Sequence, residues 1–467
     1  MAKREVSIRM YRQGLGDCFV LTFPRQSKPF HMLVDCGALN SQHYNSADMV
    51  RIVSEIRTFT KDRLDVVAAT HEHFDHTSGF VQAQGEFDEI DVANVWVAWT
   101  ENPESEAAKL LKKEFKKGKE AVEAALTRIA APPGTPLARY KDAIGALLEF
   151  SGGLGAAAGN AAAAWQYILR KAPNVYCDPK RPPLELNGVE GVRVYILGPP
   201  EDPAYVRRKL SKKETYDEGH PSFAPFAGFV AAAAGAAGDD TQAGERTLPF
   251  GKRYRINPDT AKQEKFFQER YGFEDDDSAW RRIDDDWLSL TGELALHLDS
   301  YTNNTCLALA IELGDAGPVL LFPGDAQVGN WLSWQDLKWT VKGADGEKRD
   351  VTATDLLSRT VLYKVGHHGS HNATMRGKGL ELMESPDLVA MIPVHRPTAR
   401  DQDWEFPYPP LWKRLKEKAR GRVLLADAPD ITEIEGEIAA ELSPKELERF
   451  KKSTAFEPSY VEYRIAY

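Results

Sequence analysis

The chain has 467 residues, an apolar fraction of 42% and a formal net charge of −10. This length allows two or three average domains, or one large domain with insertions, and the apolar content suffices for a real core. The acidic balance excludes a surface that is basic throughout, so nucleic acid could bind only through local basic patches or bound metals. We find neither an apolar run of membrane-spanning length nor a signal-peptide core in MAKREVSIRMYRQG, and expect a soluble, cytoplasmic protein without a membrane partner.

The first part of the chain alternates apolar and polar residues, as strands do. Three strands are predicted there: Val6–Tyr11, Cys18–Phe23 and His31–Val34. They form a hairpin or meander that we expect at the edge of a sheet, and Asp17 is interpreted as a turn residue. The apolar spacing over 45–59 predicts a helix that is capped by Asn45 or Ser46. The four scattered cysteines, which contain no CxxC pair, predict reduced and mostly buried thiols.

The stretch LDVVAATHEHFDHTSG, residues 64–79, joins a buried strand to a cluster of metal-binding side chains. In an extended loop residues i and i+2 point the same way, so His71 and His73 can converge on one ion. Asp75 and His76 follow and can face a second ion. Imidazole and carboxylate suit zinc, manganese or iron. The helical protease motif HExxH is not met, because position 75 is Asp.

Two segments interrupt the strand pattern of what we expect to be one domain over residues 1–467. Residues 102–171 are rich in Ala, Lys and Glu and predict a helical insertion. Its lysine run indicates a solvated helix face or, alternatively, a patch for phosphate. Residues 201–290 form a second insertion with the low-complexity loop GFVAAAAGAAGDDTQAGE. The insertions could cover the site, bind a protein partner or mediate self-association.

Strand spacing resumes in the second half, with helices predicted over 326–337 and 409–419. The predicted strands are Val192–Leu197, Cys306–Leu313, Val319–Phe322, Val361–Val365, Leu388–Pro393, Arg422–Ala426 and Tyr460–Tyr467. Polar side chains again follow strand ends, as Asp35, Asp325 and the pair His367 and His368. Placing acids and imidazoles where strands terminate is how a rigid sheet presents a site.

The HxHxDH loop, the earlier VDCG at 34–37 and the later FPGD at 322–325 resemble the metallo-β-lactamase fold superfamily. Three further motifs resemble, within it, the hydrolase domain of the competence DNA-uptake protein ComEC and its soluble relatives. They are GLGD at 14–17, NNTCL at 303–307 and KVGHHGS at 364–370.

The resemblance implies a four-layer αβ/βα sandwich and a site for two divalent metal ions, Zn²⁺ or Mn²⁺. It implies these ligands: His71 and His73 for the first ion, Asp75, His76 and His368 for the second, and Asp325 as the bridge. His367 would contact substrate or support a ligand, and Asp35 would orient the histidine loop. Many members of the superfamily have a further ligand His where this chain has Tyr301–Asn304, which contains none.

The resemblance and the ligand set predict a metal-dependent hydrolase, either a phosphodiesterase or a nuclease, that acts on nucleic acid or nucleotides. Asp75 would orient the metal-activated hydroxide, and His367 or Lys364 would stabilise charge on the phosphate or leaving oxygen. Lys364 could instead be a strand residue with its amine in solvent. Two alternatives stay open: hydrolysis of a thioester, lactone or lactam, and a metal-binding regulatory or partner-binding module without turnover.

Overall fold

The structure, a computed structural model, describes residues 4–39, 41–128, 156–206, 214–216, 256, 258–271, 298, 300–372, 374–402 and 404–467. The contacts divide the chain into two compact units, the first being Met1–Leu111, Glu149–Ser222 and Ser300–Tyr467. The second unit is Lys112–Leu148 and Phe223–Asp299, whose described residues are mostly helical. The low-complexity loop predicted within 201–290 lies outside the described residues. The domain boundaries predicted from the sequence stay predictions.

The first unit is a mixed α/β structure, and its larger sheet has eight strands in the order β18-β19-β1-β2-β3-β5-β7-β8. The strands are β1 (Glu5–Tyr11), β2 (Cys18–Phe23), β3 (Phe30–Cys36), β5 (Val66–Ala68), β7 (Val95–Ala98), β8 (Asn174–Cys177), β18 (Thr454–Phe456) and β19 (Tyr460–Ala466). The predicted meander is confirmed as antiparallel β1-β2-β3. Its expected edge position is wrong, because β19 pairs with β1 and β18 pairs with β19.

A second sheet has seven strands in the order β17-β16-β15-β12-β11-β10-β9. The strands are β9 (Leu184–Glu185), β10 (Val192–Gly198), β11 (Ala308–Leu313), β12 (Val319–Phe322), β15 (Thr360–Lys364), β16 (Val389–Ile392) and β17 (Val423–Leu425). From β12 to β17 neighbouring strands are parallel, so their carboxyl ends meet at one edge. Two small pairs are β4 (Arg63–Leu64) with β6 (Asp91–Val92), and β13 (Lys338–Lys342) with β14 (Lys348–Thr352).

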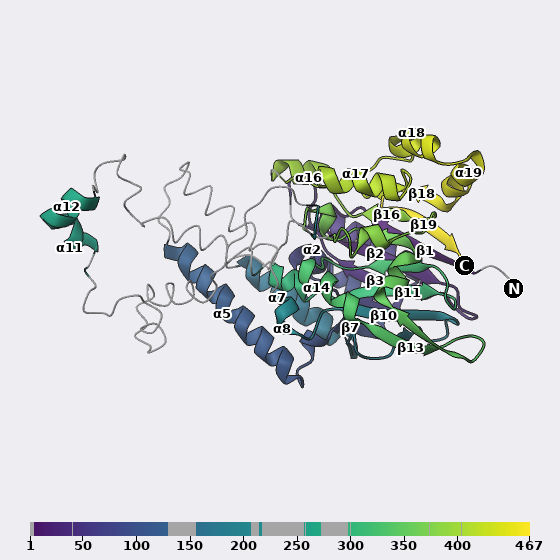
Figure 1. Cartoon of the computed structure of the whole chain (residues 1–467), viewed down its shortest axis with the longest axis horizontal. Helices are drawn as coiled ribbons and strands as arrows, with labels where there is room; N and C mark the ends of the chain where they lie inside the picture. The colour runs from purple at the N-terminus through teal and green to yellow at the C-terminus, as the bar shows by residue number, and fades with distance from the viewer. Residues whose placement is uncertain are drawn as a thin grey trace. The chain divides into compact units, whose positions relative to one another are not determined.

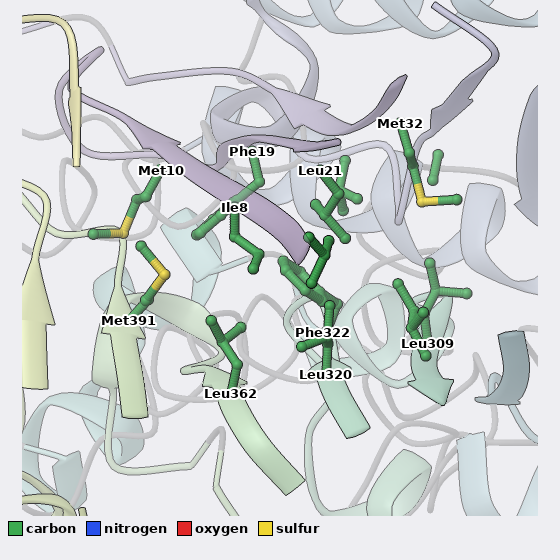
Figure 2. Packing of buried hydrophobic residues seen from close by; sticks show 14 of the residues in the cluster. Ile8, Met10, Phe19, Leu21, Met32, Leu309, Leu320, Phe322, Leu362 and Met391 are labelled. Carbon is green, nitrogen blue, oxygen red and sulfur yellow. The ribbon is translucent and has the colours of Figure 1, made fainter. Parts of the chain in front are cut away.

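One hydrophobic core joins the two large sheets, because each contributes alternate side chains to the same buried cluster. Figure 2 shows the purple strands of the first sheet facing the green strands of the second. The facing side chains include Ile8, Met10, Phe19, Leu21 and Met32 from the first sheet, and Leu309, Leu320, Phe322, Leu362 and Met391 from the second. Each such fully buried side chain contributes about 1.5–3 kcal/mol relative to exposure. This core fixes the spacing of the strand ends that carry the polar residues.

Helices pack on the opposite faces of the sheets. The first sheet is covered by a cluster that includes α1 (Ser46–Thr60), α3 (Gly79–Gln82), α4 (Gln84–Asp88) and α7 (Ala156–Lys171). The second is covered by one that includes α14 (Val328–Ser333), α15 (Ala353–Ser358) and α17 (Pro409–Lys418). Of the two predicted caps of α1, Asn45 is correct, since its side chain accepts a hydrogen bond from the Ala47 N–H. The helix predicted over 326–337 is shorter, because a 3-10 turn, η4 (Trp334–Asp336), follows α14.

The remaining helices complete the described part of the chain (Figure 1). They are α2 (Phe74–Thr77), η1 (Trp99–Glu101), α5 (Glu106–Arg128), α8 (Pro203–Val206), α11 (Pro258–Gln263), α12 (Lys265–Tyr271), η5 (His367–Gly369), η6 (Leu380–Leu382), α16 (Arg396–Asp401), α18 (Thr432–Glu441) and α19 (Pro444–Ser453). Each helix in the described ranges is too short or too polar to cross a lipid bilayer. The four cysteines are buried and free, as predicted.

Candidate metal centre

The predicted site residues lie at or just beyond the carboxyl ends of parallel strands. In the first sheet, Asp35 is the last residue but one of β3, and the histidine loop follows its parallel neighbour β5. In the second sheet, Asp325 follows β12, and His367 and His368 follow its parallel neighbour β15. The two sheets share a core, and these four segments meet in one buried cluster of charged and imidazole side chains.

Asp75, Asp325 and His368 form one group that could hold a metal ion, with one potential ligand atom from each lying within 4.8 Å of the others. The Nε2 atom of His368 lies 2.9 Å from Oδ2 of Asp75, and its Nδ1 atom lies 2.7 Å from the Pro393 carbonyl oxygen. Burial disfavours the charged imidazole, but the hydrogen bond to Asp75 and the charges of Asp75, Asp325 and Asp17 together outweigh it and raise the pKa of His368. An ion bound at Nε2 would take the place of a proton there, while the Nδ1 proton stays donated to Pro393.

His71, His76 and Asp325 form a second such group, so Asp325 belongs to both. Burial lowers the pKa of His71 well below its ordinary value, which keeps this ring in the neutral form that binds metals. Burial also disfavours a charged His76, but the surrounding carboxylates, Asp325 first, outweigh it and raise its pKa well above the ordinary value. The carboxylates that favour a proton on His76 would equally favour a bound cation.

Four buried atoms of these residues have no hydrogen-bond partner within the described part of the chain: His71 Nε2, His76 Nε2, Asp75 Oδ1 and Asp325 Oδ2. Buried polar atoms are normally paired, so such a cluster needs an explanation. His76 Nε2 and Asp325 Oδ2 lie 3.1 Å apart without the geometry of a hydrogen bond. Two atoms that bind one ion at about 2.0–2.2 Å lie about 3–3.5 Å apart. The residues present therefore fit a divalent metal ion.

His73 is buried beside these groups but joins none of them in the described residues. Its ring centroid lies 4.5 Å from that of His71, and burial lowers its pKa to about 3. The pairing of His71 with His73 on one ion stays a prediction. After His73 the chain enters the helical turn α2 at Phe74, which brings the ring centroid of His76 to within 4.2 Å of that of His71.

Asp35 orients the histidine loop, as expected from the sequence. Its Oδ1 atom accepts a hydrogen bond of 2.8 Å from the Thr70 N–H. Its Oδ2 atom lies 2.7 Å from the Thr70 hydroxyl and 2.8 Å from His76 Nδ1, and it accepts a hydrogen bond from each. Such a carboxylate fixes the tautomer of the imidazole and directs Nε2 of His76 toward the site.

Two glycines allow other loops to pack directly against Asp75. A Cβ atom on Gly16 would lie 2.6 Å from the Asp75 carbonyl oxygen, and one on Gly37 would lie 2.5 Å from the Asp75 carbonyl carbon. The Asp17 N–H donates to the same Asp75 oxygen over 2.9 Å. The motifs GLGD at 14–17 and VDCG at 34–37 therefore require glycine at positions 16 and 37, since any side chain there would displace the loop that carries Asp75.

The segment after β15 adopts a rare backbone conformation, with φ of 44° at His367, 53° at His368 and 80° at Gly369. Left-handed conformations of this kind cost about 1–3 kcal/mol at non-glycine residues. The turn directs the His367 N–H at Oδ1 of Asp325 over 2.8 Å. The His367 ring itself joins no ion-holding group among the described residues, and Nδ1 lies 3.1 Å from the Ser370 hydroxyl. At 8% its exposed fraction is the largest of the five clustered imidazoles, so it lies nearest to solvent.

The sequence interpretation missed the position of one buried ion pair, Asp17 with Lys364. The turn residue Asp17 is 2% exposed, and Lys364, for which a solvent-facing amine had been an alternative, is 1% exposed. Lys364 Nζ contacts Oδ2 of Asp17 and lies 3.3 Å from Oδ1 of Asp325. Burial disfavours the charged amine, but these carboxylates outweigh it and hold the pKa of Lys364 above its ordinary value. The sequence neighbours of Asp17 and Lys364 carry no signal of this contact, which forms between distant segments of the chain.

Tyr301–Asn304, where members of the expected superfamily carry a further His, contains no His, Cys, Asp or Glu. Asn304 instead has a structural role, because its Oδ1 atom accepts a 3.0 Å hydrogen bond from the Asn330 N–H. The site thus combines buried carboxylates with imidazoles, a donor set that binds cations and can position water. Comparison with known proteins adds no relative: no protein-family model matches this chain, and no curated protein matches it either.

Proposed function

We propose that the protein is a metal-dependent hydrolase that cleaves phosphodiester bonds. The observation that carries the proposal is the sharing of Asp325 between two buried groups, one with His71 and His76 and the other with Asp75 and His368. A shared carboxylate can bridge two neighbouring ions of the kind that hydrolyse phosphodiesters. Atoms of these side chains that have no hydrogen-bond partner among the described residues would supply ligand positions.

The ions would be Zn²⁺ or Mn²⁺, since imidazole and carboxylate ligands suit both. His71 and His76 would hold one ion, Asp75 and His368 the other, and Asp325 both. His73, buried next to His71, is an additional candidate for the first ion. When bound, two such ions lower the pKa of water and neutralise the charge of a phosphodiester.

The protein side chains have separate roles in the proposed reaction. Oδ2 of Asp75 is engaged by His368, whereas Oδ1 has no hydrogen-bond partner among the described atoms and can orient the attacking water. His367 is the most exposed of the clustered imidazoles and can stabilise negative charge on the phosphate or leaving oxygen. Lys364 contacts carboxylates, which favours a role in holding Asp325 over direct contact with substrate.

We infer further that the fold is the four-layer αβ/βα sandwich of the metallo-β-lactamase superfamily, in a ComEC-like form. The shared core between the two sheets and the helix-containing clusters on their outer faces support this inference. The strand-end positions of the HxHxDH, FPGD and KVGHHGS motifs support it as well. The lack of a His at Tyr301–Asn304 favours phosphodiester over lactam or thioester substrates, because hydrolases of the latter kinds in that superfamily generally use that ligand. The substrate would then be nucleic acid or a nucleotide.

The test is hydrolysis by the metal-loaded full chain. The purified protein would be stripped with a chelator, reloaded with Zn²⁺ or Mn²⁺, and assayed on a chromogenic phosphodiester, DNA, RNA and cyclic dinucleotides. We expect metal-dependent cleavage that Asp75→Asn abolishes and that the exposed-site control Asp350→Asn retains. A loaded protein that cleaves none of these substrates would contradict the proposal. Cleavage of thioesters, lactones or lactams instead would support the alternative hydrolase, and a stable protein partner without turnover would support a binding module.

A further inference from the structure

The two oxygens of the shared carboxylate Asp325 have different surroundings. Oδ1 accepts a 2.8 Å hydrogen bond from the His367 N–H and lies 3.3 Å from the Lys364 ammonium. Oδ2 has no hydrogen-bond partner among the described residues and lies 3.1 Å from His76 Nε2. One oxygen is thus held by the protein, while the other is left for an ion.

The ammonium that holds Oδ1 is itself fixed on several sides. Lys364 Nζ contacts Oδ2 of Asp17 and donates a 3.0 Å hydrogen bond to the Gly324 carbonyl oxygen. Its side chain is 1% exposed and that of Asp17 is 3% exposed. A buried ammonium is stable only with such partners, so each member of the pair depends on the other.

Asp17 is fixed in turn by its backbone. Its N–H donates to the Asp75 carbonyl oxygen and its carbonyl oxygen accepts from the Gly37 N–H, each over 2.9 Å. Asp17 thus connects the loop before β2, the loop after β3 and the histidine loop. Through Lys364 it also connects all three to Asp325 at the end of β12.

We propose that Lys364 and Asp17 form a positioning pair that locks Oδ1 of Asp325 and leaves Oδ2 as the oxygen with which this side chain binds ions. The inference rests on the proposed function, because it assigns a role toward the ions of that site. Rotation of the Asp325 carboxylate about its Cβ–Cγ bond would exchange the two oxygens, and the positioning pair of Lys364 and Asp17 prevents this exchange. Partners that orient a ligand in this way typically change metal affinity by about 10–100-fold when removed.

The sign of the effect separates positioning from simple charge. The Lys364 ammonium is a cation beside a cation site, so its charge alone weakens ion binding. If charge were its only influence, Lys364→Met would bind ions more tightly than the wild type. If Lys364 positions Asp325, the same substitution weakens binding, because the carboxylate loses its fixed orientation. A single affinity measurement therefore distinguishes the two.

A double variant, Asp17→Asn with Lys364→Met, removes one negative and one positive charge together. It leaves neither partner buried and uncompensated, so it remains testable if Lys364→Met does not fold. The net charge of the double variant equals that of the wild type, so a loss of affinity for metal ions would follow from the loss of the positioning pair. The matched control is Arg25→Met with Asp65→Asn, which removes another poorly exposed ion pair at the opposite end of β5.

The affinity of the full-length variants for Zn²⁺ and Mn²⁺ alone would be measured by competition with a chromogenic chelator, and folding by thermal denaturation. We expect about 10–100-fold weaker binding for Lys364→Met and for the double variant, and unchanged binding for the control. Equal or tighter binding by a folded variant overturns the positioning role while leaving the proposed hydrolase intact. A wild-type protein that binds neither ion overturns the proposed function and this inference with it.

Discussion

The imidazole of His368 and the carboxylate of Asp75 lie 2.9 Å apart, although 293 residues separate them in the sequence. Both side chains are fully buried. One follows a strand of the seven-stranded sheet and the other follows a strand of the eight-stranded sheet. The contact therefore forms only when the two sheets have packed against each other, so the site depends on the complete core of the first unit.

Removal of either partner should abolish ion binding at this position. For His368→Ala we expect a loss of activity and metal affinity greater than the roughly 10–100-fold that follows from losing an outer partner of a ligand. The measurement is metal content after dialysis, together with hydrolysis of a chromogenic phosphodiester. His43→Ala is the control, because that ring is 35% exposed and pairs with Asp401 outside the site. Full metal content in His368→Ala would contradict the assignment of this residue as a ligand.

Gly37→Ala should disturb the site through the backbone. The added Cβ would lie 2.5 Å from the Asp75 carbonyl carbon and from the His76 nitrogen, so one of the loops must move. We expect a loss of about 1–3 kcal/mol in the free energy of unfolding, as for other overpacked sites, and weaker metal binding. Gly436→Ala is the matched control, because no atom lies within 4 Å of its added Cβ. In the interior of α18 that change should stabilise the helix by up to about 1 kcal/mol.

His31 should make stability depend on pH in mildly acidic solution. Burial of the ring, only partly offset by Asp65, lowers its pKa from 6.5 to about 4. Between these values the unfolded chain binds a proton that the folded chain does not, so stability falls as pH decreases from 6.5 to 4 and changes no further below that. The full shift corresponds to about 3 kcal/mol, which partial solvent screening reduces to about 1–2 kcal/mol.

Urea denaturation of the wild type and His31→Gln across this pH range would measure the effect. The variant should lose the part of the slope that His31 contributes, while its stability near pH 8 changes only through the lost 3.0 Å hydrogen bond to the Thr22 hydroxyl. Parallel pH profiles for the two proteins would show that His31 does not titrate in this way.

Glu312 should be required for stability and not for metal binding. Its carboxylate is fully buried and lies within 3.3 Å of guanidinium groups from Arg193, Arg349 and Arg359. Glu312→Gln leaves these cations without their shared partner. Because the arginines are 19–29% exposed at their side chains, we expect a destabilisation somewhat below the roughly 3–5 kcal/mol of a fully buried pair.

The matched control for this change is Glu190→Gln, whose carboxylate pairs with Arg4 and is 72% exposed. An exposed pair contributes at most about 1 kcal/mol. Chemical denaturation would compare the two variants, and a metal-content measurement should find both equal to the wild type. A Glu312→Gln protein as stable as its control would show that the arginine network is not structural.

The sequence predicted many strands of the two large sheets and some of the helices, because their apolar periodicity is local. The predicted strand Cys18–Phe23 coincides with β2, and the predicted helix over 45–59 is α1 with Asn45 as its cap. The position of the meander within its sheet was not predictable, since it depends on β19, which lies more than 400 residues further along the chain. Pairing between distant strands leaves no local pattern in either strand.

The sequence by itself determined the donor set of this protein: histidines and aspartates at strand ends, in motifs that carry metal-binding side chains. Only the tertiary structure decided how these side chains group. The helical turn α2 brings His76 beside His71, in addition to the predicted neighbour His73. Packing of the sheets brings Asp17 to Lys364, a contact that neither residue's neighbours reveal. The physical reason is that residue spacing fixes orientation only within one element, whereas contacts between elements follow from the core that packs them together.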